Sequence, residues 1–294
     1  MTNLLFLKGY QNDQKFRDSF NELAQSTFGI NFERWYVEGF WTNRYVPYSF
    51  FYHGKVIANA SINKIDLVMN GELKKAIQIG TVMTHPDYRN QGLSRDLLNK
   101  ILEEYKSDVD LFYLYANESV LNFYPKFGFE KVEEQLFSIK FQANITSRKT
   151  SIKKLDGNNT TDILFIYEFA KKKKLHSLRF STVNTEELIM FYAMYVFPNN
   201  IIYLDHVKSI VFYEMEGSIL HLYDVISLQN VNIADILEII GNEKTLEVIF
   251  YFTPNEITSD YNSRTFIGNE TLFMKKQKNI QIPDKFKHPI LSQA

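Results

Sequence analysis

Residues 77–94 read Ile-Gln-Ile-Gly-Thr-Val-Met-Thr-His-Pro-Asp-Tyr-Arg-Asn-Gln-Gly-Leu-Ser, and this stretch carries the main signal for the fold. An apolar, β-prone run ends at His85-Pro86, a short loop follows, and a helix is predicted over 91–105. The first N–H groups of a helix have no partner within it, and the helix dipole adds positive charge there. Gly92 lacks a Cβ, so an anion can approach its backbone closely. The pattern predicts an anion site at a helix N-terminus, although many loops with one glycine begin a helix and bind nothing.

The order of the residues in this loop is more telling. Arg89-x-x-Gly92-x-Ser94, after a strand ending in His-Pro, resembles the acetyl-CoA pyrophosphate loop of the GNAT acetyltransferases, whose pattern is Gln/Arg-x-x-Gly-x-Gly/Ala. Ser94 departs from that pattern, but it is small enough to leave the backbone accessible. By this resemblance, loop N–H groups hold the pyrophosphate and the preceding strand pairs with the pantetheine arm. The implied acetyl-CoA contacts are Val82, Met83, Thr84, Arg89, Asn90, Gln91, Gly92, Leu93, Ser94 and Asn117. The alternative role of Arg89 is that of a solvated loop arginine.

A second motif follows the strand-like run Leu111-Phe112-Tyr113-Leu114-Tyr115-Ala116. Asn117 comes next, then Phe123-Tyr124 and Gly128-Phe129, and this spacing resembles the later GNAT motif. The resemblance implies that Tyr124 is the general acid that protonates the departing CoA thiolate, and that Asn117 contacts the pantetheine arm. The alternatives are a packed helix tyrosine and a simple helix N-cap.

The rest of the first half gives a strand, two helices, three antiparallel strands, a helix, a strand, a helix and a strand. The periodicity predicts strands at Leu4–Gly9, Pro47–Tyr52, Val56–Ile65, Leu73–Thr84, 109–116 and Phe129–Phe141, and helices at Asp13–Phe28, Phe32–Phe40, 91–105 and Asn117–Pro125. Asp66–Met69 and Leu73–Thr84 flank a turn at Asn70-Gly71. Asn70-Gly71 is the strongest hairpin signal. This is the GNAT order, so we expect an α/β (α+β) GNAT fold, with a mixed central sheet flanked by helices.

The remainder is long enough for a second domain. We expect a GNAT domain over 1–145 and a second α+β domain over 150–294. Its predicted helices are Ile163–Phe169, Glu186–Val196 and Asn232–Ile240, and its predicted strands are Ile201–Asp205, Ser209–Tyr213, Ile219–Ile226, Leu246–Phe252 and Leu272–Lys275. This order echoes the first half but lacks both motifs. It indicates a degenerate GNAT-like copy, or else an unrelated accessory domain.

The amino-acid composition argues against several other classes of function. The net charge of −1 gives no sign of a nucleic-acid surface or an electrostatic membrane anchor. The chain has no Cys and no metal-ligand spacing of His or carboxylates, so we expect no metal. No apolar run approaches the roughly 20 residues of a membrane span, and we expect a cytoplasmic monomer or homodimer.

The acceptor side is expected in the aromatic segment 33–48, which contains both tryptophans. Glu33, Trp35, Glu38 and Trp41 are its candidate residues, because an aromatic wall with a carboxylate receives a cationic amine. The alternative is helix packing. The general base is not readable from the sequence: Asp66, Glu72, Glu38 and His85 are all candidates.

The function expected from the resemblance is transfer of an acetyl group from acetyl-CoA to a primary amine of a small molecule. The alternatives are an acyltransferase with another acyl donor or an O- or peptide acceptor, and an acyl-CoA-binding sensor without turnover. Tyr124 favours an enzyme, since a sensor needs no proton donor at the sulfur.

Overall fold

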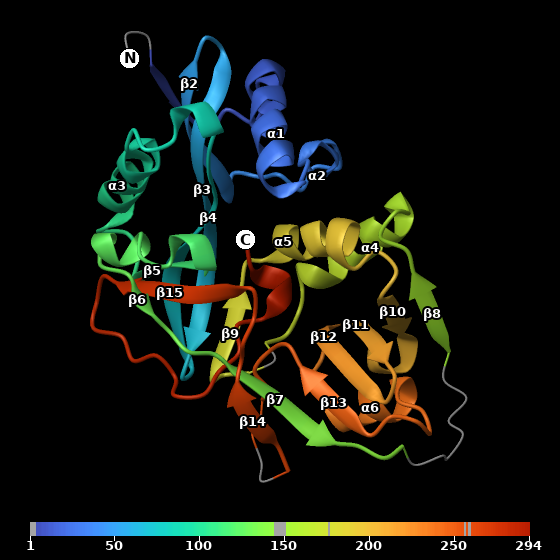
Figure 1. The fold of residues 1–294 in the computed structure, drawn as a ribbon. Helices are drawn as coiled ribbons and strands as arrows, with labels where there is room; N and C mark the ends of the chain where they lie inside the picture. The colour runs from blue at the N-terminus through green and yellow to red at the C-terminus, as the bar shows by residue number, and fades with distance from the viewer. Residues whose placement is uncertain (1–3, 144–150, 176, 256, 258–259) are drawn as a thin grey trace.

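Two β-sheets with helices packed against them make up the molecule in this computed structural model (Figure 1). The structure describes residues 4–143, 151–175, 177–255, 257 and 260–294. Within them, the first sheet has the strand order β1-β2-β3-β4-β5-β15-β6, with β9 beside β3, and the second has the order β14-β7-β13-β12-β11-β10-β8. The mixed α/β class and the two-domain arrangement expected from the sequence are thereby confirmed.

The elements have the following bounds. The strands of the first sheet are β1 (Leu5–Lys8), β2 (Tyr45–Tyr52), β3 (Lys55–Met69), β4 (Glu72–Thr84), β5 (Leu111–Asn117), β6 (Glu130–Lys131), β9 (Phe180–Val183) and β15 (Glu270–Lys276). The strands of the second are β7 (Gln135–Lys140), β8 (Ile152–Leu155), β10 (Ile201–Leu204), β11 (Ser209–Glu216), β12 (Ile219–Ser227), β13 (Glu247–Phe250) and β14 (Asn262–Thr265). The α-helices are α1 (Gln14–Phe28), α2 (Glu33–Val37), α3 (Leu93–Tyr105), α4 (Thr160–Ala170), α5 (Glu186–Phe191) and α6 (Ile233–Ile240). The short turns are η1 (Pro86–Tyr88), η2 (Glu118–Val120), η3 (Tyr124–Phe127), η4 (Tyr192–Val196, a π turn), η5 (Asp205–Val207) and η6 (Ile290–Ser292).

Local signals set several of these boundaries. The predicted hairpin between β3 and β4 is confirmed, with Met69 opposite Glu72. Asn70 and Gly71 both have positive φ, at 50° and 81°, as a two-residue type I′ turn requires. Asp13 caps α1 by accepting a hydrogen bond from the N–H of Phe16.

Three predicted elements differ from the structure. The helix predicted over Asn117–Pro125 is replaced by the turns η2 and η3, and Pro125 stands in the first turn of η3, where its missing N–H costs no hydrogen bond. The helix predicted over Phe32–Phe40 ends at Val37, shortly before Gly39 with its φ of 85°. The strand predicted over Phe129–Phe141 divides into β6 and β7, which lie in different sheets.

The two sheets exchange strands. In the first sheet β15, from the end of the chain, lies between β5 and β6; in the second sheet β7, from the first half, lies between β13 and β14. The prediction that Leu272–Lys275 closes the second half is therefore wrong: that strand completes the first sheet. The domain boundary predicted between 145 and 150 lies outside the described residues. The matching position of the exchanged strands favours two related halves.

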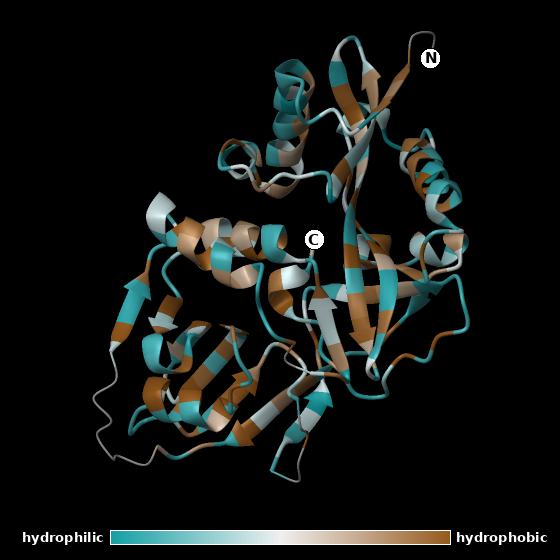
Figure 2. Cartoon of the chain, turned by 180° about the vertical axis from the view of Figure 1, so that it is seen from behind, coloured by the Kyte–Doolittle hydropathy of each residue, from teal (hydrophilic) through white to brown (hydrophobic). Residues whose placement is uncertain are grey.

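Hydrophobic residues line the strands of both sheets, whereas the side of α1 seen in Figure 2 is mostly hydrophilic. Leu97, Leu98 and Ile101 of α3 are fully buried against the first sheet. A second core cluster joins α1 and α2 of the first half to α4 and α5 of the second. The halves therefore share a core, in addition to their exchanged strands.

A buried ion pair fixes the chain between the two sheets. Lys287 Nζ donates to Glu134 Oε1 at 2.8 Å, and the N–H of His288 donates to the same oxygen at 3.0 Å. The His288 ring contacts the Tyr113 hydroxyl on β5, with 3.2 Å between Nε2 and the oxygen. Burial and the neighbouring Lys287 charge lower the pKa of His288 to about 3. His288 is therefore neutral at physiological pH.

Candidate active site

The site begins where two parallel strands separate. β4 and β5 pair over Ala76–Ile79 and Leu111–Leu114, and each strand then continues beyond the paired stretch. Thr81 of β4 has a φ of 49°, and the register between β3 and β4 shifts in this region. A bulge of this kind bends a strand away from its neighbour. The two strands therefore open into a wedge beyond Ile79 and Leu114.

Two side chains hold the bulge in place. The Thr81 hydroxyl lies 2.8 Å from the hydroxyl of Tyr45, and its carbonyl accepts a hydrogen bond of 2.8 Å from Asn59 Nδ2. Both partners are buried in the neighbouring strands. The wedge is thus a fixed feature of the sheet.

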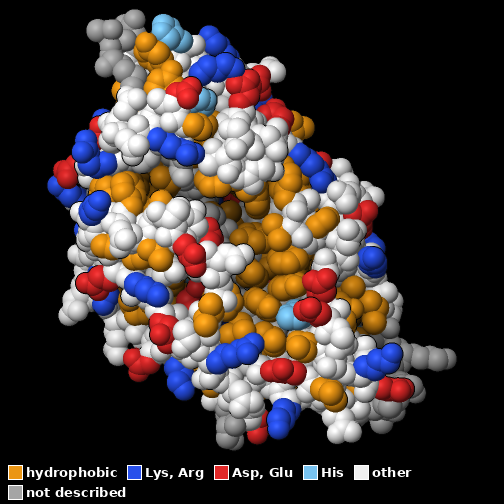
Figure 3. All heavy atoms as spheres, viewed as in Figure 1, with side chains coloured by type: hydrophobic (Ala, Val, Ile, Leu, Met, Phe, Trp, Pro, Cys, Tyr) orange, Lys and Arg blue, Asp and Glu red, His pale blue; other side chains and the backbone are white. Residues whose placement is uncertain are grey.

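The wedge opens into a cavity of about 1270 Å³ that extends beside α3 and α5. Figure 3 shows that hydrophobic side chains gather in the middle of this face, over α5 and β12. Small-molecule sites usually occupy about 300–1000 Å³, so the volume is sufficient for an elongated ligand and a second small molecule.

The loop before α3 has a geometry suited to the predicted anion site. Gly92 is the N-cap of α3, with a φ of 79°, and no side chain caps the helix. A Cβ built on Gly92 would lie 2.6 Å from Arg95 Nη2, so the arginine fork lies directly over this glycine. Ser94 and Thr84 share a hydrogen bond of 2.7 Å between their hydroxyls, which ties the helix start to the end of β4. Free helical N–H groups beside a guanidinium are suited to a phosphate.

Nine of the ten predicted acetyl-CoA contacts line this cavity. They are Val82, Met83, Thr84, Arg89, Asn90, Gly92, Leu93, Ser94 and Asn117. Gln91 lies outside the lining, where its Nε2 donates to the Asp87 carbonyl at 3.5 Å. Arg89 Nε donates to the Thr84 carbonyl at 3.2 Å. Sequence reasoning missed Arg95; its position three residues after Gly92, within the first helical turn, was the available signal.

Tyr124 lines the same cavity from the first position of η3. Its side chain is 5% exposed, and its ring packs against Phe129 and Phe273, with centroids 6.2 Å away in each case. Burial, reinforced by the charge of Glu270, raises the pKa of Tyr124 to about 12. The phenol is therefore protonated at neutral pH and able to donate a proton.

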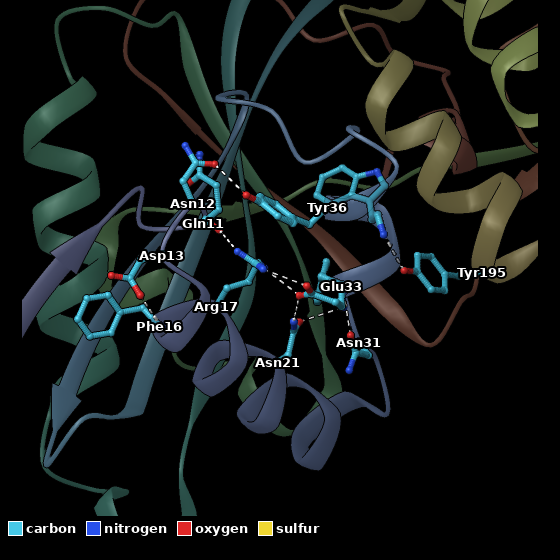
Figure 4. A network of polar contacts seen from close by, with 12 residues as sticks. Gln11, Asn12, Asp13, Phe16, Arg17, Asn21, Asn31, Glu33, Tyr36 and Tyr195 are labelled. Atoms are coloured by element: carbon cyan, nitrogen blue, oxygen red, sulfur yellow. Dashed lines mark hydrogen bonds and ion pairs between the residues drawn. The ribbon is translucent and has the colours of Figure 1, made fainter. Parts of the chain in front are cut away.

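The carboxylate of Glu33 is engaged elsewhere. It accepts hydrogen bonds from Arg17 Nε and Nη2 at 2.8 and 3.0 Å, and from Asn21 Nδ2 at 3.2 Å (Figure 4). Arg17 also donates to the Gln11 carbonyl and lies 3.7 Å from the centroid of the Tyr36 ring. This network fixes α1 to α2, and Glu33 does not line the cavity.

Of the other predicted acceptor residues, Trp35 lines the cavity, and Glu38 and Trp41 do not. The Trp35 indole N–H donates to the Glu187 carbonyl at 2.9 Å, which joins α2 to α5. Trp41 is buried, and its indole N–H donates to the Tyr45 carbonyl. The four candidate bases, Asp66, Glu72, Glu38 and His85, also lie outside the lining.

The second half supplies a wall of the cavity that sequence reasoning did not identify. Leu188 and Phe191 of α5, Tyr192 and Val196 of η4, and Glu270 of β15 line it. Phe191 packs on Trp35 and Phe32, at centroid distances of 6.0 and 5.5 Å. Residues so far apart in the chain give no local pattern that would reveal this wall.

The corresponding wedge of the second sheet is filled by the chain itself. β12 and β13 pair in parallel over Ile219–Leu222 and Glu247–Phe250. Beyond that point the N–H of Ile290 donates to the Tyr251 carbonyl, and the buried Leu291 of η6 packs nearby. The helix that follows, α6, has Asn232 as its N-cap, and this side chain accepts from the N–H of Ala234. The second sheet therefore lacks both an open wedge and an uncapped helix start, the two features that suit the first sheet to an anion.

Comparisons with known proteins agree with this geometry. A family model described as an acetyltransferase (GNAT) domain matches residues 12–132. No curated protein matches the chain. Among solved structures, the chain is similar to a probable N-acyltransferase from Enterococcus faecalis V583, with a TM-score of 0.64, 14% identity, and coverage of 94% of this chain and 73% of that one. It is also similar to Eis1 from Mycobacterium abscessus, with a TM-score of 0.57, 14% identity, and coverage of 94% and 74%.

A GCN5-related N-acetyltransferase from Kribbella flavida gives a TM-score of 0.57 at 15% identity, with coverage of 94% of this chain and 72% of that one. These likenesses extend over both halves, and at such identities they show the fold. Among the helices that the structure describes, none is long and apolar enough to cross a membrane. The match to the acetyltransferase (GNAT) domain model over residues 12–132 includes the wedge, the loop at Gly92 and Tyr124.

Proposed function

We propose that the protein is an acetyl-CoA-dependent N-acetyltransferase that acts on the primary amine of a small molecule. The observation that carries this proposal is a single continuous cavity. It runs from the uncapped start of α3 at Gly92, along the open edge of β4, to the phenol of Tyr124.

The cavity suits each part of acetyl-CoA. The pyrophosphate would lie at the N–H groups that follow Gly92, between the cationic side chains of Arg89 and Arg95. The pantetheine arm would lie along Val82–Thr84, where β4 has parted from β5. In this arrangement the thioester would face Tyr124.

The chemistry then requires a neutral amine and a proton for the leaving thiolate. The amine lone pair attacks the thioester carbonyl, the C–S bond breaks, and the nitrogen releases one proton as the amide forms. Tyr124 donates its proton to the sulfur, because a buried phenol with a pKa of about 12 remains protonated at working pH.

The full-length protein should release the CoA thiol in the presence of suitable primary amines. A thiol assay over a panel of small amines, with acetyl-CoA as donor, measures this directly. A thermal-shift titration with acetyl-CoA separates binding from turnover. Stabilisation by acetyl-CoA without thiol release for any amine would indicate a sensor and overturn the proposal; release from a longer acyl-CoA alone would assign another donor.

A further inference from the structure

Glu270 stands apart from the other charged residues of the cavity. Arg89, Arg95 and Lys126 also line it, and all three are basic. Glu270 is the one acidic side chain among the lining residues within the described part of the chain. Ala294 also lines the cavity, with its carbonyl carbon and oxygen against Gly80 on β4. Among the lining side chains, Glu270 is the one that can offer a negative charge to a cationic ligand.

The exchanged strand puts this carboxylate at the reacting end of the wedge. Glu270 is the first residue of β15 and lies opposite Asn117, the last residue of β5. The chain enters η2 directly after Asn117 and reaches Tyr124 at the start of η3. Glu270 therefore lies beside the segment that carries the Tyr124 phenol. This is the end of β5 that lies beyond the stretch Leu111–Leu114, where β5 pairs with β4.

The electrostatics agree with this position. The charge of Glu270 adds to burial in raising the pKa of both Tyr124 and Tyr192. Glu270 is an exposed residue of β15, and desolvation of its carboxylate in the cavity wall raises its pKa above the usual value for a glutamate. Both phenols are neutral at physiological pH, and Lys126 is the basic lining residue on the neighbouring turn. Ionisation of the Glu270 carboxylate therefore changes the charge at this end of the cavity, and the raised pKa places that change above the usual range of a glutamate.

We propose that Glu270 binds the ammonium group of the acceptor and removes a proton from it before acetyl transfer; this inference rests on the proposed function. The second half would then take part in the reaction through the strand that it donates. The surrounding wall of Trp35, Phe191 and Tyr192 is aromatic, so we assign the acceptor to the class of primary amines with one positive charge and an apolar body.

The step balances without any further reactant. One N–H bond of the ammonium breaks, and its proton moves to the Glu270 carboxylate. The freed lone pair forms the bond to the thioester carbonyl carbon, and the C–S bond breaks as sulfur takes the proton of Tyr124. The second proton released by the nitrogen returns to the Tyr124 oxygen. Nothing is oxidised or reduced, and the products are the amide, CoA and a protonated Glu270 that releases its proton to water.

Glu270→Gln in the full-length protein tests this proposal, with 2-phenylethylamine as the monocationic probe and spermidine as the polycationic comparison. We expect kcat/KM for 2-phenylethylamine to fall roughly 10²-fold or more at pH 7, since general base catalysis contributes about 10²–10⁴-fold. Acetyl-CoA affinity should stay unchanged. Glu270→Asp should restore part of the rate, and Glu130→Gln, on the exposed neighbouring strand β6, should behave as wild type.

The pH profile distinguishes a base from a packing residue. In wild type, kcat/KM should fall on the acid side as Glu270 becomes protonated. In Glu270→Gln that limb should vanish, and the rate should follow the free-amine fraction up to the amine pKa near 10. The gap between the two proteins should therefore narrow as the pH rises.

An unchanged rate and profile in Glu270→Gln would overturn the role of this residue while leaving the acetyltransferase proposal intact. Turnover of spermidine but not of 2-phenylethylamine by wild type would overturn the acceptor class. Binding of acetyl-CoA without turnover of any amine would instead refute the proposed function itself.

Discussion

Tyr124→Phe removes one hydroxyl from the reacting end of the cavity and keeps the ring. The contacts of that ring with Phe129 and Phe273 are made by carbon atoms, so the fold should be retained. The pKa of about 12, against an ordinary 10, favours the neutral phenol by roughly 2.7 kcal/mol. At pH 8 only about one phenol in 10⁴ would be ionised, so nearly every Tyr124 would carry the proton that it donates.

We expect single-turnover acetyl transfer in Tyr124→Phe to slow by at least tenfold, within the roughly 10²–10⁴-fold range of general acid catalysis. Steady-state rates would understate the effect if product release limits wild type, so rapid mixing with excess enzyme is the appropriate assay. Acetyl-CoA affinity should remain nearly constant. In wild type, Tyr124 should cause no loss of rate below about pH 11, because its raised pKa keeps the proton in place.

Tyr88→Phe is the matched control, because this phenol also lines the cavity but lies beside the glycine loop. It should retain the wild-type single-turnover rate. Equal rates in wild type and Tyr124→Phe would refute the assignment and move the proton donor to another group.

Three further predictions concern stability. Lys287→Met should lower the free energy of unfolding by about 3–5 kcal/mol, measured by denaturant titration, because it leaves Glu134 buried without its partner; a loss below 1 kcal/mol would contradict this. Because the pKa of His288 is lowered in the folded state, the unfolded chain binds a proton that the folded chain does not bind. The free energy of unfolding should therefore fall by about 1.4 kcal/mol per pH unit from pH 6 toward 4. His288→Gln should show a shallower slope, and equal slopes would exclude His288 as the cause. A fragment of residues 1–145 should aggregate on expression, because β5 loses its neighbour β15; a soluble, folded fragment would show that the exchanged strand is dispensable.

Local chemistry made much of the first half predictable. Asn70-Gly71 specifies its own turn, Asp13 caps the helix that follows it, and Gly92 marks the start of α3. Each of these signals acts within a few residues, so the sequence displays it directly. The loop from Arg89 to Ser94 and the residue Tyr124 were predictable for the same reason, because each belongs to a motif with short, fixed spacings along the chain.

The remaining features depend on partners that are distant in sequence. The pairing of Glu270 with Asn117 exists only once β15 crosses into the first sheet. Glu33 was a reasonable acceptor candidate by residue type, yet Arg17 on the preceding helix takes up its carboxylate. The hydrophobic pattern of β15 shows a strand, but a strand pattern does not say which sheet receives it.

Calorimetry of full-length Gly92→Glu tests most directly whether acetyl-CoA binds at the start of α3. The new side chain would occupy the phosphate position and bring a carboxylate against it, while the positive φ adds about 1–2 kcal/mol of strain. Gly217→Glu is the matched control, since Gly217 has a φ of 61° with open space around it in the second half. We predict that Gly217→Glu binds acetyl-CoA like wild type and that folded Gly92→Glu shows no measurable binding. Wild-type affinity in Gly92→Glu would contradict the account.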